Sequence, residues 1–284
     1  MRVPSCAALV FAGLARAAVA DPAGLDAFID QARGADVVVL GEVHDNPAHH
    51  ANQAAIVAAL APAALVFEMI PQAKEEAVND MRAHGAPLSD IAVELNWRES
   101  GWPDFQFYSA ILAAAPHAQI FGAGQPATDV ARAMEEGAAA AFGPDAAIYG
   151  LDKPLRHGEQ VQREAVLRDA HCEPPAPEML PRMVEAQRFR DAGLADAAMW
   201  ARTMTGGGQV VVIAGSGHAD RHLGMPALIG LADPDLRVVS LGQFEAAPDD
   251  PGAYDAVLLA AAPSRPDPCA GQEAEPDPPA SGSE

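Results

Sequence analysis

Two short segments of the sequence combine glycine with side chains that can carry out chemistry. They are Gly41-Glu42-Val43-His44 and Gly215-Ser216-Gly217-His218, and both follow a run of apolar residues. Carboxylates and imidazoles bind metal ions and exchange protons near neutral pH. Glycine tolerates backbone conformations that other residues avoid, so we expect Gly41 and Gly215 to let the chain turn sharply beneath each histidine.

Six runs rich in Val, Ile, Leu and Phe predict the strands that position these residues. They cover residues 36–42, 64–69, 118–124, 209–217, 236–243 and 254–261, the last as a candidate edge strand. The first five runs are continuously apolar, which is typical of parallel strands buried on both faces. Since helical segments separate the runs, the sequence predicts an α/β fold with a mostly parallel central sheet flanked by helices and a smaller helical subdomain.

Two helix starts can be placed from local signals. After His44, either Asp45 or Asn46 is suited to cap a helix whose first position is Pro47. A second helix is expected after Pro71 and is predicted to end at Gly85.

A long helical pattern covers residues 177–204. Its predicted inner face consists of Leu180, Met183, Val184, Leu194, Ala197, Ala198 and Met204. We expect His49 and His50, on the earlier helix, to face solvent.

The polar residues fall at the ends of the predicted strands. Glu42 and His44 lie just past the first strand, Glu68 closes the second, and His218 follows the fourth. Because open parallel sheets bind ligands at the carboxyl ends of their strands, we expect these four side chains to share one pocket. The nearby helix start favours a neutral His44. The four residues suit a metal site, acid–base catalysis or a purely structural polar network.

The chain divides into three parts. Residues 1–20 predict a secretory signal, with Arg2 before an apolar run and Ala18-Val19-Ala20 before the expected cleavage site. Residues 21–262 are expected to form one α/β domain with a helical insertion around 86–205, and residues 263–284 an acidic, proline-rich disordered tail. Cys6 lies too early for a lipobox, and no later transmembrane span is expected, so the mature chain is expected in the periplasm or outside the cell.

The net charge excludes some classes of ligand, and the cysteines leave two alternatives open. The formal net charge is −21, which argues against binding to nucleic acid or to anionic lipid. Removal of the signal would leave Cys172 and Cys269. They either form a disulfide, which an oxidising compartment permits, or remain thiols.

Several longer segments resemble the ChaN-type haem-binding family of the Tiki and TraB superfamily. They are "VVVLGEVHDNPAHH", "LVFEMI", "NWRESGWPDFQFYSAI", "MVEAQRFRDAGLADAAM" and "VVIAGSGHADRHLGMPALI". The resemblance covers most of residues 36–260. It implies a parallel sheet with a helical subdomain, secretion or lipid anchoring, and a role in haem or iron acquisition. This sequence departs from the family in lacking the lipobox, which argues against lipid anchoring.

The resemblance also implies a haem ligand. Haem binding in the family is associated with tyrosine ligation, and Tyr108 follows a matching block that contains Trp97 and Arg98. These three residues, with His44 and His218, are the candidate haem contacts. Expected partners are haem itself and either an outer-membrane haem receptor or a second copy of the chain.

Two functions therefore remain open. One is a periplasmic or secreted haem-binding protein for haem uptake. The other is a metal-dependent hydrolase in which Glu42, His44, Glu68 and His218 hold a divalent ion or act as acid and base. The sequence leaves open whether the protein is an enzyme.

Overall fold

The structure is a computed structural model that describes residues 22–266 and 269–270. The predicted signal at 1–20 lies outside the described residues. The same holds for most of the predicted tail at 263–284.

Six parallel strands form one sheet in the order β3-β2-β4-β1-β5-β6. Their bounds are β1 Val37–Glu42, β2 Ala64–Pro71, β3 Gln119–Gly124, β4 Val210–Gly215, β5 Val238–Phe244 and β6 Ala256–Leu259. The α/β prediction is confirmed. All six predicted strands are present, and the predicted edge strand is β6 at one edge of the sheet.

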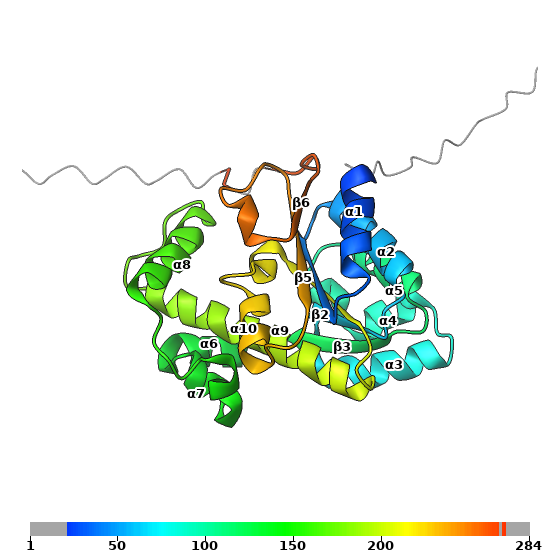
Figure 1. Cartoon of the computed structure of the whole chain (residues 1–284), viewed down its shortest axis with the longest axis horizontal. Helices are drawn as coiled ribbons and strands as arrows, with labels where there is room; N and C mark the ends of the chain where they lie inside the picture. The colour runs from blue at the N-terminus through cyan, green and yellow to red at the C-terminus, as the bar shows by residue number, and fades with distance from the viewer. Residues whose placement is uncertain (1–21, 267–268, 271–284) are drawn as a thin grey trace, which may run out of the picture.

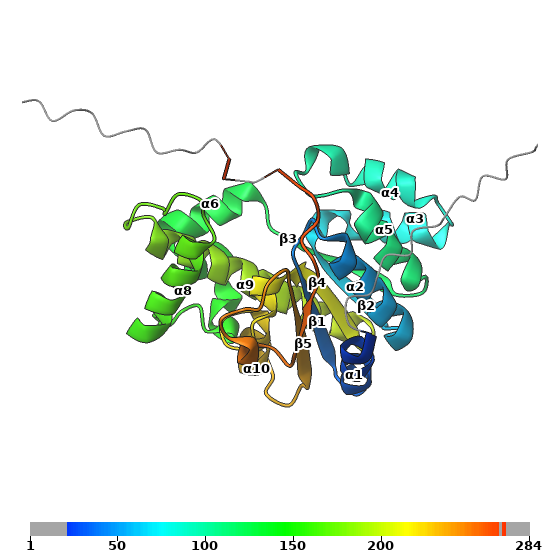
Figure 2. The ribbon, with the colours of Figure 1, turned by 90° about the horizontal axis from the view of Figure 1, so that it is seen from above.

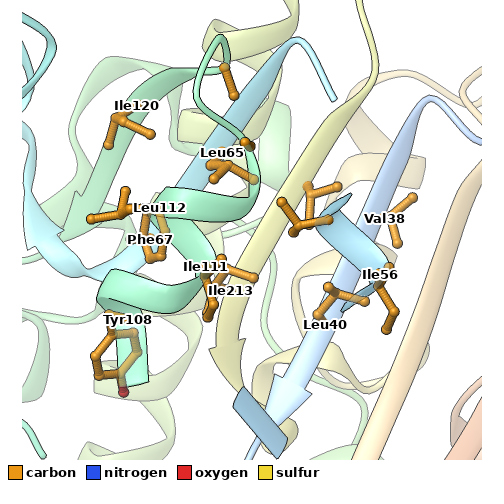
Figure 3. Close-up of a cluster of buried hydrophobic side chains, with 14 of the residues drawn as sticks. Val38, Leu40, Ile56, Leu65, Phe67, Tyr108, Ile111, Leu112, Ile120 and Ile213 are labelled. Atoms are coloured by element: carbon orange, nitrogen blue, oxygen red, sulfur yellow. The ribbon is translucent and has the colours of Figure 1, made fainter. Parts of the chain in front are cut away.

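The continuous apolar runs reflect burial on both faces of the sheet. All six residues of β1 are buried. Val38 and Leu40 contribute to one hydrophobic core, whereas Val37 and Val39 contribute to the other. Figure 3 shows the first of these cores, with Val38, Leu40 and Ile56 packed together. An exposed face would have required alternate polar residues along the strand.

Helices cover both faces of this sheet. They are α1 Pro22–Ala32, α2 Pro47–Leu60, α3 Glu75–Ala83, α4 Leu88–Glu94, α5 Phe105–Ala114, α6 Ala127–Glu136, α7 Ala138–Phe142, α8 His157–Asp169, α9 Leu180–Met204 and α10 Met225–Ala232. Short 3-10 turns are η1 Gln72–Lys74, η2 Trp97–Glu99, η3 Pro144–Tyr149, η4 Ser216–Ala219 and η5 Pro251–Ala253. Helices α1 to α5 lie on one side of the sheet and α6 to α10 on the other (Figures 1 and 2).

Local sequence signals fix the helix ends near the site. Asn46 is the cap of α2, because its side chain accepts a hydrogen bond from the Ala48 amide, and Pro47 takes the first helical position. Gly85 follows α3 with φ +71°, a left-handed conformation that favours glycine. Of the two caps proposed from the sequence, Asn46 is the one used.

Helix α9 largely follows its predicted inner face. Leu180, Val184, Leu194, Ala197 and Ala198 are buried. Met183 is half-buried. Met204 is 50 % exposed, so its predicted place in the core is wrong. It is the last residue of α9, where the chain turns away toward β4.

The range 86–205, expected to be a helical insertion, contains the edge strand β3 as well as helices. Because β3 pairs with β2, this range is built into the sheet. Its helices divide between the two faces: α4 and α5 lie on one side, and α6 to α9 on the other (Figures 1 and 2).

A disulfide joins Cys172 to Cys269, with Cα atoms 5.4 Å apart. Of the two alternatives for these cysteines, the structure has the bridge. It holds the end of the described chain beside the connection between α8 and α9. Along the described chain, no helix combines the length and apolarity needed to span a bilayer.

The strand order places the two Gly-x-x-His segments side by side. β1 and β4 are neighbours, and Glu42 pairs with Gly215 across them. Gly41 has no positive φ, so the sharp turn expected of it is absent. Instead, a Cβ at Gly41 would lie 2.8 Å from the Ser216 Cα and 2.9 Å from the Leu241 carbonyl oxygen. Glycine is needed there because backbone approaches closely on both sides.

We expect Gly41→Ala to destabilise the fold by about 1–3 kcal/mol, because the added methyl group meets rigid backbone. Gly217→Ala is the matched control, since a Cβ at Gly217 meets nothing within 4 Å. Its effect is expected to stay within about 0.5 kcal/mol. Urea unfolding measures both changes. Equal stability of the two variants would contradict the close-approach explanation.

Candidate functional site

The site begins at a buried carboxylate. Glu42, the last residue of β1, is 2 % exposed. Its Oε1 accepts hydrogen bonds from the Tyr108 hydroxyl at 2.7 Å and from His44 Nδ1 at 2.8 Å. Its Oε2 accepts from Gln53 Nε2 at 2.8 Å and lies 3.4 Å from His50 Nδ1. A carboxylate removed from water is stable only with such partners, so Glu42 holds these side chains around itself.

The hydrogen bond to Glu42 orients His44. With Nδ1 directed at Glu42, the ring edge meets Trp102, the two ring centroids being 5.0 Å apart. A Cβ at Gly215 would lie 3.0 Å from His44 Nε2. Gly215 also has no positive φ, so its role is to leave space for the imidazole rather than to turn the chain.

A second cluster lies next to the first. The Glu68 carboxylate accepts a hydrogen bond from the Gly215 amide at 2.8 Å and lies 3.4 Å from His218 Nε2. His218 Nδ1 lies 2.6 Å from Asp191 Oδ1 on α9. β2 continues past Glu68 to Pro71, and its pairing with β3 shifts register between Phe67 and Pro71. Such irregularities re-aim side chains, and Glu68 here reaches across to the end of β4.

The charges of the second cluster depend on one another. Burial opposes the charge on His218, but the carboxylates of Glu68 and Asp191 outweigh it and raise the histidine pKa to about 10. Burial likewise opposes the charge on Glu68, but the His218 imidazolium and the Gly215 amide lower its pKa to about 2. For Asp191, burial dominates and raises the pKa. At neutral pH, His218 is therefore an imidazolium beside the Glu68 carboxylate.

His44 does not behave as its position at a helix start predicts. Burial lowers its pKa, but the hydrogen bond to Glu42 and the charge of Glu68 outweigh burial, and the net shift is upward. The net upward shift of the His44 pKa is opposite to the shift expected from the helix start. Two nearby carboxylates act more strongly than the partial charge of the α2 N-terminus.

A cleft of about 690 Å³ opens beside these residues. His44, Glu68 and His218 line it, together with Arg190. The remaining walls are mainly apolar, formed by Met69, Pro71, Leu95, Trp102, Ala123, Pro126 and Leu194. Glu42 lies behind His44, outside the lining. The structure thus brings the four predicted residues together, with three on the cleft surface and Glu42 as the buried support of His44.

The three haem contacts carried over from the family resemblance lie elsewhere. Tyr108 is 1 % exposed, and Figure 3 shows its ring at the edge of the hydrophobic core. Burial and the charge of Glu42 raise the pKa of its hydroxyl, which therefore stays protonated. Trp97 is buried and donates a hydrogen bond to the Pro103 carbonyl. Arg98 is exposed and lines a neighbouring hollow that shares Trp102 with the cleft.

His49 and His50 are buried, so their predicted solvent exposure is wrong. His49 Nδ1 accepts a hydrogen bond from the Val43 amide. His50 Nε2 lies 2.8 Å from the His44 carbonyl oxygen. Both rings therefore brace the loop that carries His44. The apolar pattern of α2 is weak because alanine dominates the helix, and it did not reveal that these polar residues face inward.

Two further site residues were missed in the sequence. Gln53 and Asp191 are buried and hydrogen-bonded to Glu42 and His218. A carboxylate inside the apolar pattern of α9 was the available signal for Asp191, because an unpaired charge is rarely placed in a core. Gln53 carried no comparable signal.

The four candidate metal ligands form two separate pairs. Glu42 faces His44, whereas Glu68 faces His218. Among the residues that the structure describes, no group of three or more histidines, cysteines or carboxylates is arranged to hold a metal ion. The geometry provides hydrogen-bonded acid–base pairs rather than a converging ligand set.

The raised pKa of His218 predicts how stability changes with pH. This histidine stabilises the fold fully below pH 6.5, its ordinary pKa, and the contribution is lost as pH rises through about 10. Between these values we expect the free energy of unfolding to fall by at most about 1.4 kcal/mol per pH unit, the limit for one proton. Urea unfolding of the wild type and of His218→Gln measures this slope.

His218→Gln removes the titrating group, so its slope in this pH window should be smaller. His84→Gln is the control, because His84 is exposed and contacts only Asp80 of the preceding helix. A wild-type slope in His218→Gln would show that other groups cause the pH dependence.

Comparison with known proteins agrees with this architecture. The family described as "Haem-binding uptake, Tiki superfamily, ChaN" matches residues 28–229. The solved structure "Cofacial heme binding to ChaN of Campylobacter jejuni" is similar with a TM-score of 0.64 and 21% identity, covering 82% of this chain and 91% of that one. At this identity the likeness shows a shared fold.

Two other solved structures are more distant. The type III effector HopBA1 has a TM-score of 0.47 and 12% identity, covering 84% of this chain and 93% of its own. A succinoglycan biosynthesis protein has a TM-score of 0.40 and 14% identity, covering 81% of this chain and 71% of its own. The comparison with curated proteins finds no match. The family match spans most of the sheet and both Gly-x-x-His segments, and the chain therefore belongs to the haem-binding uptake family of the Tiki superfamily, ChaN.

Proposed function

We propose that this protein binds haem in the cleft, where His44 would hold the iron. Family membership supports haem as the ligand. The observation that carries the assignment of His44 is its geometry. Nδ1 is tied to Glu42, and the imidazole lines the cleft. A histidine whose second nitrogen is held by a carboxylate is a common arrangement for a metal ligand.

The residues of the cleft suit the parts of haem. Haem needs an apolar slot, an axial donor and a cation near its propionates. The walls contributed by Met69, Leu95 and Leu194 are apolar, and Trp102 offers a flat ring beside His44. Arg190 is exposed at the lining and is the cation available to a propionate there.

The bound group would supply an iron able to accept an imidazole nitrogen. The protein controls whether that nitrogen carries a proton. Neutral His44 that donates its Nδ1 proton to Glu42 carries its lone pair on Nε2. An imidazolium has no lone pair to offer. Since the pKa of His44 is raised, ligation should weaken as pH falls through the range in which His44 gains its proton.

Tyr108 remains the alternative ligand suggested by the family. In this structure its hydroxyl is buried and donates to Glu42, so ligation would require it to leave that contact and lose its proton. Burial and the Glu42 charge both oppose the loss of this proton. His44 already lies on the cleft surface and needs neither change.

We further propose that the mature protein acts in the periplasm or outside the cell, in haem uptake. The signal-like residues 1–20 and the disulfide support this location, because disulfides persist in oxidising compartments. An outer-membrane receptor or a second copy of the chain is the proposed partner. The Campylobacter jejuni structure is described as binding haem cofacially, and two facing clefts are one way to bring haems face to face.

Hemin titration followed through the Soret band tests the ligand assignment. We expect saturable binding by the wild type, and His44→Ala should weaken it by at least about tenfold, the scale on which metal-site partners act. His84→Ala is the matched control, since His84 is exposed at the C-terminal end of α3. Tyr108→Phe should retain the wild-type Soret position. If Tyr108→Phe changed the spectrum and His44→Ala did not, tyrosine would be the ligand.

Expression in a Gram-negative host tests the location. We expect the protein in the periplasmic fraction to begin at Asp21, with the mass of residues 1–20 lost. Intact-mass measurement under non-reducing conditions reads the cleavage and the disulfide together. Full-length protein confined to the cytosol would contradict the proposed export.

A further inference from the structure

A second cavity lies behind the cleft, among η3, α8, α9 and α10. Its volume is about 490 Å³. Asp191 belongs to its lining, and Asp191 also contacts His218, which lines the cleft. The two hollows are therefore neighbours separated by one hydrogen-bonded pair. Nothing in the proposed haem site uses the second cavity.

Two buried arginines lie within its lining. Arg188 donates to Glu185 and to the carbonyl oxygens of Gly150 and Lys153, so its charge is already matched. Arg163 pairs with Glu159 through Nε and Nη2. Its Nη1 lies 3.8 Å from Asp191 Oδ2, which is an ion pair without a hydrogen bond.

The rim of the cavity carries cations with no partner. Lys153 and Arg156 are exposed and line the cavity. Neither side chain makes a hydrogen bond or ion pair with any residue that the structure describes. They stay unpaired although the chain has 39 acidic and 18 basic residues. At physiological salt, screening limits charge effects to about 8 Å, so these local cations outweigh the net charge of the chain.

The cavity also has an apolar wall. Leu228 is buried there, whereas Ile148 and Leu231 are 48 % and 63 % exposed. Large apolar side chains exposed around a hollow mark a place where an apolar body can bind. Negative charge is present as well, because the carboxylates of Glu159 and Asp191 belong to the same lining. These carboxylates would repel a compact, multiply charged anion.

We propose that this cavity is a second ligand site, for a small monocarboxylate with an apolar body. Its carboxylate would pair with Lys153 and Arg156, and its body would cover Ile148 and Leu231. The cations match the carboxylate end of such a molecule, and the apolar side chains match its apolar body. Because Asp191 joins the cavity to His218, an occupant would lie two side chains away from the cleft.

Calorimetric titration of the disulfide-intact protein with sodium octanoate tests the proposal. We expect one saturable site, and the uncharged match octan-1-ol should bind at least about tenfold more weakly. Lys153→Ala should weaken octanoate binding to a similar extent. Lys74→Ala is the matched control, because Lys74 is the other lysine of the sequence and pairs with Glu94 away from this cavity.

Leu231→Glu provides an independent variant. It places a carboxylate on the exposed apolar wall, so it should weaken octanoate binding while thermal unfolding stays as in the wild type. The proposal is overturned if octanoate fails to saturate, or if Lys153→Ala binds it like the wild type. It is also overturned if hemin displaces octanoate and Lys153→Ala weakens hemin binding, because the cavity would then be the haem site.

Discussion

The burial of the Glu42 carboxylate is the constraint on which the site depends. An anion with 2 % exposure at a strand end must be matched by donors that do not move. These donors come from three places: Gln53 on α2, Tyr108 on α5, and His44 on the loop between β1 and α2. The same hydrogen bonds to Glu42 therefore hold two helices against the sheet and orient His44. Loss of any donor would weaken both.

Close packing of the two segments against each other explains why glycine precedes each histidine. Since β4 lies between β1 and β2, the ends of three adjacent strands carry Glu42, Gly215 and Glu68. Gly41 admits Ser216, and Gly215 admits the His44 ring. Each segment makes room for the other, so the two Gly-x-x-His segments form a single reciprocal contact. A β1 and β4 pairing shifted by one residue would put side chains where these glycines stand.

Much of this arrangement follows from the sequence, and the limits have physical causes. The continuous apolar runs predict the strands because burial on both faces leaves no polar alternation, as in β1. Strand ends then predict that His44 and His218 meet. What the sequence does not give is the direction in which a polar side chain points on an alanine-rich helix, and His50 was misplaced for that reason. Nor does the sequence give the direction of the pKa shift of His44, which depends on carboxylates that folding brings near.

Both cleft histidines lie near Glu68, but they differ in how readily they lose a proton. Glu68 carries a charge felt by both imidazoles, yet His218 has Asp191 as a second carboxylate at 2.6 Å. That surplus of negative charge keeps the His218 proton in place until about pH 10, so His218 offers no lone pair at neutral pH. His44 has Glu42, whose carboxylate already accepts hydrogen bonds from three donors. Of the two, His44 is therefore the histidine that can lose its proton and present a free nitrogen to an iron in the cleft, while His218 remains a fixed positive charge on the opposite cluster.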